Sequence, residues 1–171
     1  MNREQALDRL RTRCSREEVC SGMALTLLKR WSAGSSTSGS SSTSGSSFTE
    51  QDMAQIIATL VKEKFIDDNR FADAFVRDKL KFNGWGKQKI VFKLRSLGVA
   101  ADIIERALRE NYYCSDEKLS GQKVLEKLLE KKWKSLKEDE PLQVRKTKAV
   151  RFAAGRGFEY GDIIAALAKI M

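Results

Sequence analysis

Two stretches of the chain, KIVFKLRSLGVAADIIERAL (89–108) and KAVRFAAGRGFEYGDIIAAL (148–167), align with each other at a shift of 59 residues. The shift pairs apolar positions with apolar positions, and it pairs Gly98 with Gly157. Each glycine stands where a helix should end and is followed by an apolar residue, Val99 or Phe158, as in left-handed helix C-caps. The alignment therefore predicts the same pair of helices in two places.

Each predicted pair is preceded by a third helical segment, DNRFADAFVRDKLKF (68–82) in one case and DEKLSGQKVLEKLLEKKW (116–133) in the other. Apolar residues recur in them at spacings of three and four, the period of a half-buried helix. Asp67 or Asp68 is expected to cap the first segment, and Ser115 or Asp116 the second, because a cap oxygen accepts from the free amides of the first turn.

The N-terminal part of the chain repeats this order. It reads as REQALDRLRTR (3–13), SREEVCSGMALTLLKRW (15–31) and TEQDMAQIIATLVKEKF (49–65). Ser15 and Glu18 have the spacing of a capping box for the second of these helices. Residues 32–47 are Ser, Gly and Thr with one Ala, a flexible coil that spans about 22 Å. So regular a tract is interpreted as an engineered linker that replaces a shorter natural connection.

The predicted fold is therefore all-α, an elongated array of three tandem three-helix repeats at residues 1–67, 68–112 and 113–171. A single proline in 171 residues and the abundance of Ala, Leu, Lys, Arg and Glu agree with this fold class. Such repeats stack because one unit cannot bury its own apolar face.

Composition argues against catalysis. The chain has no histidine, which is the commonest general base and metal ligand, and it shows no phosphate loop, nucleophile elbow or metal-ligand spacing. We expect a protein that is not an enzyme and needs no cofactor or metal. Cys14, Cys20 and Cys114 are interpreted as reduced, mostly buried thiols. The absence of a signal peptide or membrane-length apolar stretch predicts a cytoplasmic protein that does not enter membranes.

Positive charge is concentrated between Arg77 and Arg95, where seven cations face one aspartate. The turn Gly84-Trp85-Gly86 separates two helices there, so cations from both can converge. Amides at the start of the second helix are expected to form an anion seat. Trp85 has two readings, stacking on a base or side chain of a partner, or packing between repeats.

The third repeat carries a similar set, Arg145, Lys146, Lys148, Arg151 and Arg156, with no acid between Gln143 and Gly157. With a net charge of +9, the chain attracts polyanions such as nucleic acid or an acidic protein surface. A solvated basic surface without a partner is the alternative. The pair Asp67-Asp68 is assigned to helix capping rather than to magnesium. The regularly spaced Phe65, Phe71, Phe75, Phe82 and Phe92 are assigned to the core.

The second repeat also resembles the RecX family of bacterial recombinase regulators. The shared signature is an Ile-Asp-Asp before an Arg-Phe-Ala helix, then a glycine, a basic helix and a Leu…Gly-Val ending. Here it is formed by Ile66, Asp67, Asp68, Arg70, Phe71, Ala72, Phe75, Gly86, Ile90, Leu94, Gly98 and Val99. The family departs from this chain in having a compact turn in place of the Ser/Gly tract.

The resemblance implies a non-enzymatic protein that binds RecA, above all the RecA filament on single-stranded DNA. It also implies inhibition of strand exchange, ATP hydrolysis and co-protease activity. Direct, sequence-independent binding of single- or double-stranded DNA is the main alternative, and a purely structural repeat is the third. The expected state is a monomer. The resemblance supplies Arg70, Arg77, Lys87 and Lys89; charge adds the rest of the predicted binding set, Lys79, Lys81, Trp85, Lys93, Arg95, Arg145, Lys148 and Arg151.

Overall fold

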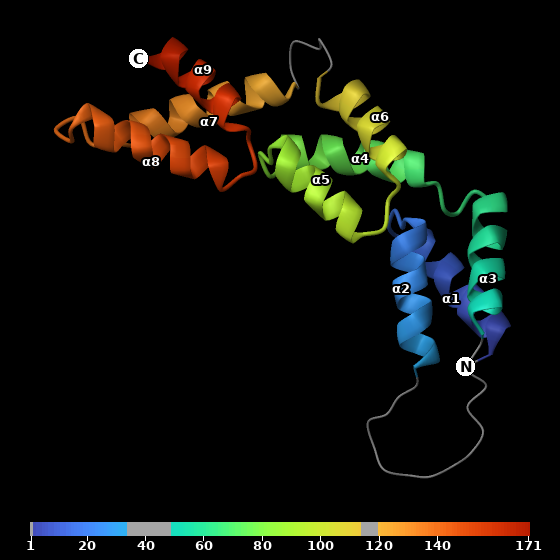
Figure 1. The fold of residues 1–171 in the computed structure, drawn as a ribbon. Helices are drawn as coiled ribbons and strands as arrows, with labels where there is room; N and C mark the ends of the chain where they lie inside the picture. The colour runs from blue at the N-terminus through green and yellow to red at the C-terminus, as the bar shows by residue number, and fades with distance from the viewer. Residues whose placement is uncertain (1, 34–48, 114–119) are drawn as a thin grey trace, which may run out of the picture. The chain divides into compact units, whose positions relative to one another are not determined.

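The computed structural model describes residues 2–33, 49–113 and 120–171, and within these ranges it consists of helices joined by short turns (Figure 1). The helices of the first predicted repeat are α1 (Arg3–Cys14), α2 (Ser21–Ser32) and α3 (Glu50–Lys62). Those of the second are α4 (Asp68–Lys81), α5 (Lys87–Ser96) and α6 (Ala101–Asn111). Those of the third are α7 (Gly121–Lys134), α8 (Leu142–Ala154) and α9 (Tyr160–Ile170). The all-α prediction is confirmed.

By their internal contacts the residues form two compact units. The first unit holds Met1–Phe71 together with Leu97–Val99, and the second holds Ala72–Ser96 and Ala100–Met171. The compact units thus do not coincide with the predicted repeats, because the turn after α5 belongs with the first three helices. The boundaries predicted at residues 67 and 112 stay predictions.

The core of the first unit lies among α1, α2 and α3. It is formed by apolar side chains at helical spacing, all almost fully buried: Ala6, Leu10, Val19, Ala24, Leu28, Met53, Ile56, Leu60 and Ile66. In the second unit, α7, α8 and α9 enclose a matching core of Leu125, Leu129, Ala149, Ala153, Phe158, Ile163, Ala166 and Leu167. Both cores follow the apolar period seen in the sequence.

The two glycine C-caps are confirmed. Gly98 and Gly157 have φ values of +80° and +88°, in the left-handed region that favours glycine. The apolar residues after them, Val99 and Phe158, are buried.

Two helix starts, those of α2 and α7, differ from the prediction. Ser15 ends α1 rather than starting α2, since its hydroxyl donates to the Thr12 carbonyl, so the predicted capping box with Glu18 is wrong. Helix α2 begins at Ser21. Helix α7 begins at Gly121, and the hydroxyl of Ser120 accepts from the Lys123 amide as its cap. The caps predicted at 115 and 116, like Cys114 and linker residues 34–47, lie outside the described residues.

Two of the five phenylalanines assigned to the core are instead on the surface. Phe82 is 71% exposed and Phe92 is 73% exposed, whereas Phe71 is buried. Phe92 lies midway between Ile90 and Leu94, the two buried residues of α5, and a helix places that position on its opposite face. Phe82 follows the last residue of α4, where the buried stripe has ended.

The cysteine assignment holds for the described thiols. Cys14 and Cys20 are free, and Cys20 is fully buried. Burial raises the pKa of both thiols, which keeps them protonated and unreactive. Of the helices that the structure describes, none has the length and apolar character needed to cross a bilayer.

Candidate basic surface on helices α4 and α5

The basic stretch is organised by the turn Gly84-Trp85-Gly86, which docks on the C-cap turn of α8. The Gly86 amide donates to the Arg156 carbonyl at 2.8 Å, and the Gln88 amide donates to the Gly157 carbonyl at 3.0 Å. From the other side, the Arg156 guanidinium donates to the Asn83 carbonyl at 2.8 Å. We call these contacts, between residues 83–89 and 156–158, the glycine joint.

Glycine is required on both sides of the joint. A Cβ at Gly86 would lie 2.3 Å from the carbonyl carbon of Gly157 and from the Phe158 amide nitrogen. A Cβ at Gly157 would lie 2.5 Å from Cβ of Lys89. Because the opposing atoms at Gly86 are backbone, they cannot rotate away, so the close approach fixes the start of α5 against the third repeat.

The predicted anion seat at the start of α5 is not available. The amides of Gly86 and Gln88 are used in the glycine joint, and the amide of Lys87 donates to the Tyr112 hydroxyl at 3.2 Å. These are the amides that an anion at a helix N-terminus would need. The joint therefore uses them for folding, and any anion binding at this turn depends on side chains.

Trp85 is half-buried, and one cation from each of the two helices lies over its ring. Its ring meets Phe75 edge to face with centroids 6.4 Å apart. The ammonium groups of Lys79 and Lys89 lie 5.2 Å and 4.8 Å from the ring centroid. Such cation–π contacts each contribute about 0.5–1 kcal/mol at exposed sites. Trp85 thus packs within its own repeat and holds one lysine of α4 and one of α5 close together.

Three cations of this surface have neither an ion pair nor a ring contact in the described part of the chain. They are Arg77, Lys93 and Arg95, and all three are exposed. Lys81 lies above the exposed Phe82 ring, with its ammonium 5.2 Å from the ring centroid. These charges remain available to an outside anion, since no acid of the same unit neutralises them.

Lys87 is more constrained than the sequence suggested. Its ammonium lies 3.3 Å from Glu159 and 5.6 Å from the Tyr113 ring centroid. The hydrogen bond with Tyr113 and then that with Glu159 raise the pKa of Lys87, so the side chain is charged and partly neutralised. Lys87 contributes less free charge than its neighbours.

A groove between α5 and α6 adjoins these cations. It has a volume of about 420 Å³ and an apolar lining that includes Val91, Ile104 and Leu108. Lys87, Arg95 and Arg109 also line it. Arg109 was missed by the sequence analysis, because α6 carries more acids than arginines and shows no excess of positive charge.

The cations of the third repeat are mostly engaged internally. Arg145 lies over Trp133 at 4.5 Å, and Lys148 pairs with Glu140 at 2.5 Å. Arg156 lies 4.7 Å above Phe152 in addition to its bond in the glycine joint. Arg151 is exposed and has no ion pair with any residue that the structure describes. Of this set, Arg151 has the charge most available to a partner.

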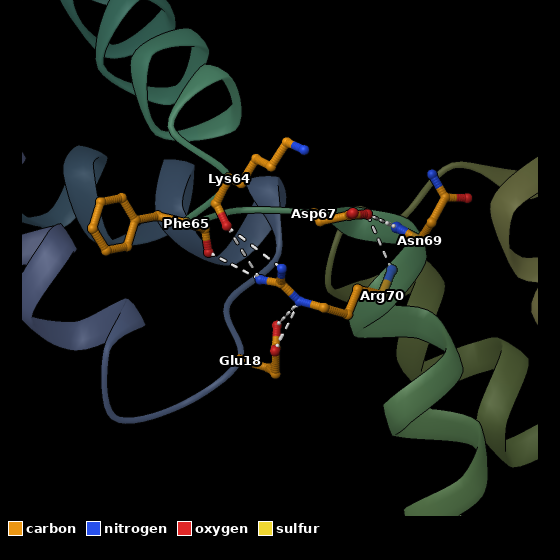
Figure 2. A network of polar contacts seen from close by, with 6 residues as sticks. All are labelled: Glu18, Lys64, Phe65, Asp67, Asn69 and Arg70. Atoms are coloured by element: carbon orange, nitrogen blue, oxygen red, sulfur yellow. Dashed lines mark hydrogen bonds and ion pairs between the residues drawn. The ribbon is translucent and has the colours of Figure 1, made fainter.

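Arg70 has a structural role in the first unit (Figure 2). Its Nε lies 2.9 Å and 3.1 Å from the two carboxylate oxygens of Glu18, and its terminal nitrogens donate to the carbonyls of Lys64 and Phe65 at 3.4–3.5 Å. The guanidinium thereby joins the start of α4 to the turn before α2 and the turn after α3. We leave Arg70 out of the binding surface for this reason.

The pair Asp67-Asp68 acts in helix capping, as predicted. Asp67 accepts from the amides of Asn69 and Arg70 at 2.9 Å and 3.1 Å, which caps α4 (Figure 2). Asp68 accepts from the Ser21 amide at 2.7 Å and so caps α2, whose own N-cap residue makes no side-chain capping bond. Within the described residues, no group of three or more potential ligands could hold a metal ion.

Comparison with known proteins places these features in a family. The model of the second three-helix domain of RecX matches residues 67–108, and that of the third three-helix domain matches residues 121–167. The regulatory protein RecX of Pelodictyon phaeoclathratiforme is 30% identical over 120 residues, which are 70% of this chain and 69% of that protein.

Other RecX proteins are longer than the matched region. The match to RecX of Clostridium tetani is 30% identical and covers 72% of this chain but 55% of that protein. The match to RecX of Oceanobacillus iheyensis is 37% identical and covers 67% of this chain and 40% of that protein. The chain thus spans about half the length of these two relatives. A solved RecX structure from Lactobacillus salivarius has a TM-score of 0.77 at 17% identity, covering 98% of this chain and 96% of that one, so the fold is shared.

Proposed function

Because the chain belongs to the RecX family of regulatory proteins, we propose that it regulates the RecA recombinase by binding the RecA filament on single-stranded DNA. In this proposal it acts as a cytoplasmic monomer without catalysis of its own. Binding suppresses strand exchange, ATP hydrolysis and co-protease activity. Its contact surface is the basic face of α4 and α5, with Arg151 of α8.

The observation that supports this proposal is the set of unpaired cations in one compact unit. Arg77, Lys93, Arg95 and Arg151 lack ion-pair partners among the residues described, and the glycine joint ties α5 to α8 in that unit. A filament presents the same acidic and phosphate groups at regular intervals, so several weak contacts add up as avidity. A rigid set of free charges suits such a target better than a flexible one, because less side-chain and backbone entropy is lost.

Direct binding of naked DNA is the second candidate, and the same cations favour it. The two candidates differ in what the partner must supply. A phosphate backbone alone attracts any exposed cation, whereas a filament adds protein contacts that fit the apolar groove between α5 and α6. The filament reading therefore predicts much tighter binding to RecA on DNA than to either component alone.

The test measures the fluorescence anisotropy of a dye attached to the protein. Three partners are titrated in separate experiments. They are RecA, an unlabelled oligothymidylate, and the filament that these two form with a slowly hydrolysed ATP analogue. We expect affinity for the filament at least tenfold above that for either component. The triple variant Arg77→Ala, Lys93→Ala, Arg95→Ala should lose about tenfold or more of this affinity.

The matched control removes three exposed lysines of α7, Lys127→Ala, Lys131→Ala and Lys134→Ala, which changes the net charge equally. We expect it to bind the filament within about threefold of the wild type. Equal loss in both variants would mean that net charge alone drives binding. Equal affinity for naked DNA and for the filament would favour the DNA-binding candidate.

A further inference from the structure

A second cationic site lies in the first compact unit, where the sequence analysis placed no function. Four arginines, Arg9, Arg13, Arg16 and Arg30, and Trp31 line a hollow of about 610 Å³. We propose that this hollow binds single-stranded nucleic acid, with its arginines on the phosphates and a base stacked on Trp31 in the place that the Arg9 guanidinium takes in the free protein. This site is separate from the surface proposed for the filament and does not depend on it.

Helix periodicity assembles the hollow. Arg9, Arg13 and Arg16 follow one another at spacings of four and three, which places them on one side of α1 and the turn after it. The Arg16 amide donates to the Arg13 carbonyl at 3.0 Å, so the turn continues the helical path. Arg30 comes from the last turn of α2, where a cation also meets the negative end of the helix dipole.

Part of the hollow is already ordered. The Arg9 guanidinium lies 4.7 Å from the centroid of the Trp31 ring, and Trp31 packs on the core of the unit. Arg13 forms an ion pair with Glu17 and is half-buried. Glu17 is the acid that lines the hollow, so the lining keeps a net positive charge. Arg16 and Arg30 are exposed and have no ion pair among the residues described.

Arg11, on the same helix, has a structural role, in contrast to the arginines of the hollow. Each of its three guanidinium nitrogens donates once, to Asp8 at 2.9 Å and to Glu63 at 2.6 Å and 2.9 Å, and this ties α1 to the end of α3. Helix α1 thus divides its arginines between a structural ion pair and the hollow.

The residue types select the ligand. The cations in the lining are arginines without a lysine, and the planar guanidinium fork binds two phosphate oxygens at once. An unpaired base that replaces the Arg9 guanidinium over the Trp31 indole would stack there, with about 1–3 kcal/mol per base, and would leave Arg9 to a phosphate. Bases in a duplex are stacked on each other and do not enter such a hollow. An acidic peptide would satisfy the charges but has no base to stack on the indole.

The test uses Trp31 as the reporter. The full chain with Trp85→Phe and Trp133→Phe retains Trp31 as its tryptophan, since the sequence has 3. Titration with a short oligothymidylate, without RecA, should quench its fluorescence. The added changes Arg16→Ala and Arg30→Ala should weaken binding at least tenfold. They should also reduce the slope of log affinity against log salt by about 1.4, at about 0.7 per phosphate contact.

The matched control, Arg3→Ala with Lys62→Ala, removes two exposed cations of the same unit that lie outside the hollow, and it should bind like its parent. Arg16→Lys with Arg30→Lys keeps the charge and should still lose severalfold. Circular dichroism checks that each variant is folded.

Three results would overturn the proposal: no quenching of Trp31, equal weakening by the control pair, or equally tight binding of polyglutamate. Because RecA is absent from this titration, its failure leaves the filament proposal standing. Conversely, quenching of Trp31 should survive the triple change at Arg77, Lys93 and Arg95 even if filament binding is never observed.

Discussion

At the residue scale, Gly86 shows how a position without a side chain can organise a surface made of side chains. Its missing Cβ lets the turn after α4 touch the backbone at Gly157, and this contact consumes the amides at the start of α5. The sequence analysis read the Gly-Trp-Gly turn as a place where cations converge. It did not foresee a backbone contact with a residue some seventy positions away, because such contacts leave no trace in local spacing.

Replacing Gly86 with alanine should therefore loosen the joint. The new Cβ would sit 2.3 Å from backbone atoms, so we expect the free energy of unfolding to fall by about 1–3 kcal/mol or more. Gly161→Ala is the matched control, because a Cβ there meets nothing within 4 Å and Gly161 lies in helix α9. Alanine should stabilise α9 by up to about 1 kcal/mol. Urea unfolding followed by circular dichroism gives both values; equal effects would show that the joint is not tight.

Tyr112 gives the same joint a pH dependence. Its buried hydroxyl accepts from the Lys87 amide, and desolvation raises the pKa of Tyr112 from 10.0 to about 12. An acid with a raised folded-state pKa stabilises the fold fully below the unfolded pKa and loses that contribution as pH rises through the folded value. The window for Tyr112 is therefore from about pH 10 to about 12.

Tyr112→Phe should be less stable than the wild type by about 1–2 kcal/mol at pH 8, because the Lys87 amide loses its acceptor. This difference should shrink as pH rises from 10 to 12, since the variant has no hydroxyl to ionise. Thermal unfolding of both proteins at several pH values checks it. A difference that stays constant over this range would contradict the account of the buried hydroxyl.

At the element scale, helix identity could be read from the sequence, but some helix ends could not. The glycine caps of α5 and α8 were predictable because a glycine followed by an apolar residue has a defined geometry. The start of α2 was not, because its cap is Asp68, which comes from a different helix. Ser15 and Glu18 had the right spacing and instead bond to Thr12 and Arg70.

The candidate site, like the helix ends, was predictable only in part. Charge density pointed to α4 and α5, but it did not show which cations are already paired. Lys148 and Arg70 bind acids of the same chain, whereas Arg77, Lys93 and Arg95 have no such partner among the described residues. Pairing depends on tertiary distance, which periodicity does not report. For the same reason, the arginines around Trp31 stayed hidden in a segment of mixed charge.

In the turn after α3, the chain has a lysine at a position whose backbone conformation favours glycine. Lys64 has φ of +60°, in the left-handed region, where α5 and α8 are followed by glycine. Lys64→Gly should raise the free energy of unfolding by about 1 kcal/mol, because the left-handed conformation costs a residue with a Cβ about that much. Lys62→Gly, within α3, should lower it by about 1 kcal/mol. Thermal melts compare the two, and a destabilising Lys64→Gly would contradict this reading of the turn.

At the scale of the whole molecule, the proposed function depends on which charges are free rather than on the excess of +9 alone. Within the described residues, the second unit presents exposed, unpaired cations on α4, α5 and α8, and the glycine joint links α5 with the end of α8. The first unit presents its own arginine hollow. If both proposals hold, the two sites would let the protein engage a filament that contains both protein and single-stranded DNA.

The rate of ATP hydrolysis by RecA on single-stranded DNA, measured with increasing amounts of this protein, tests the central claim most directly. We predict that the wild type lowers the rate and that the Arg77→Ala, Lys93→Ala, Arg95→Ala variant needs about ten times more protein for the same inhibition. The α7 control, with Lys127, Lys131 and Lys134 changed to alanine, should inhibit like the wild type. An unchanged rate with the wild type, or equal inhibition by the wild type and the α4–α5 variant, would contradict the account.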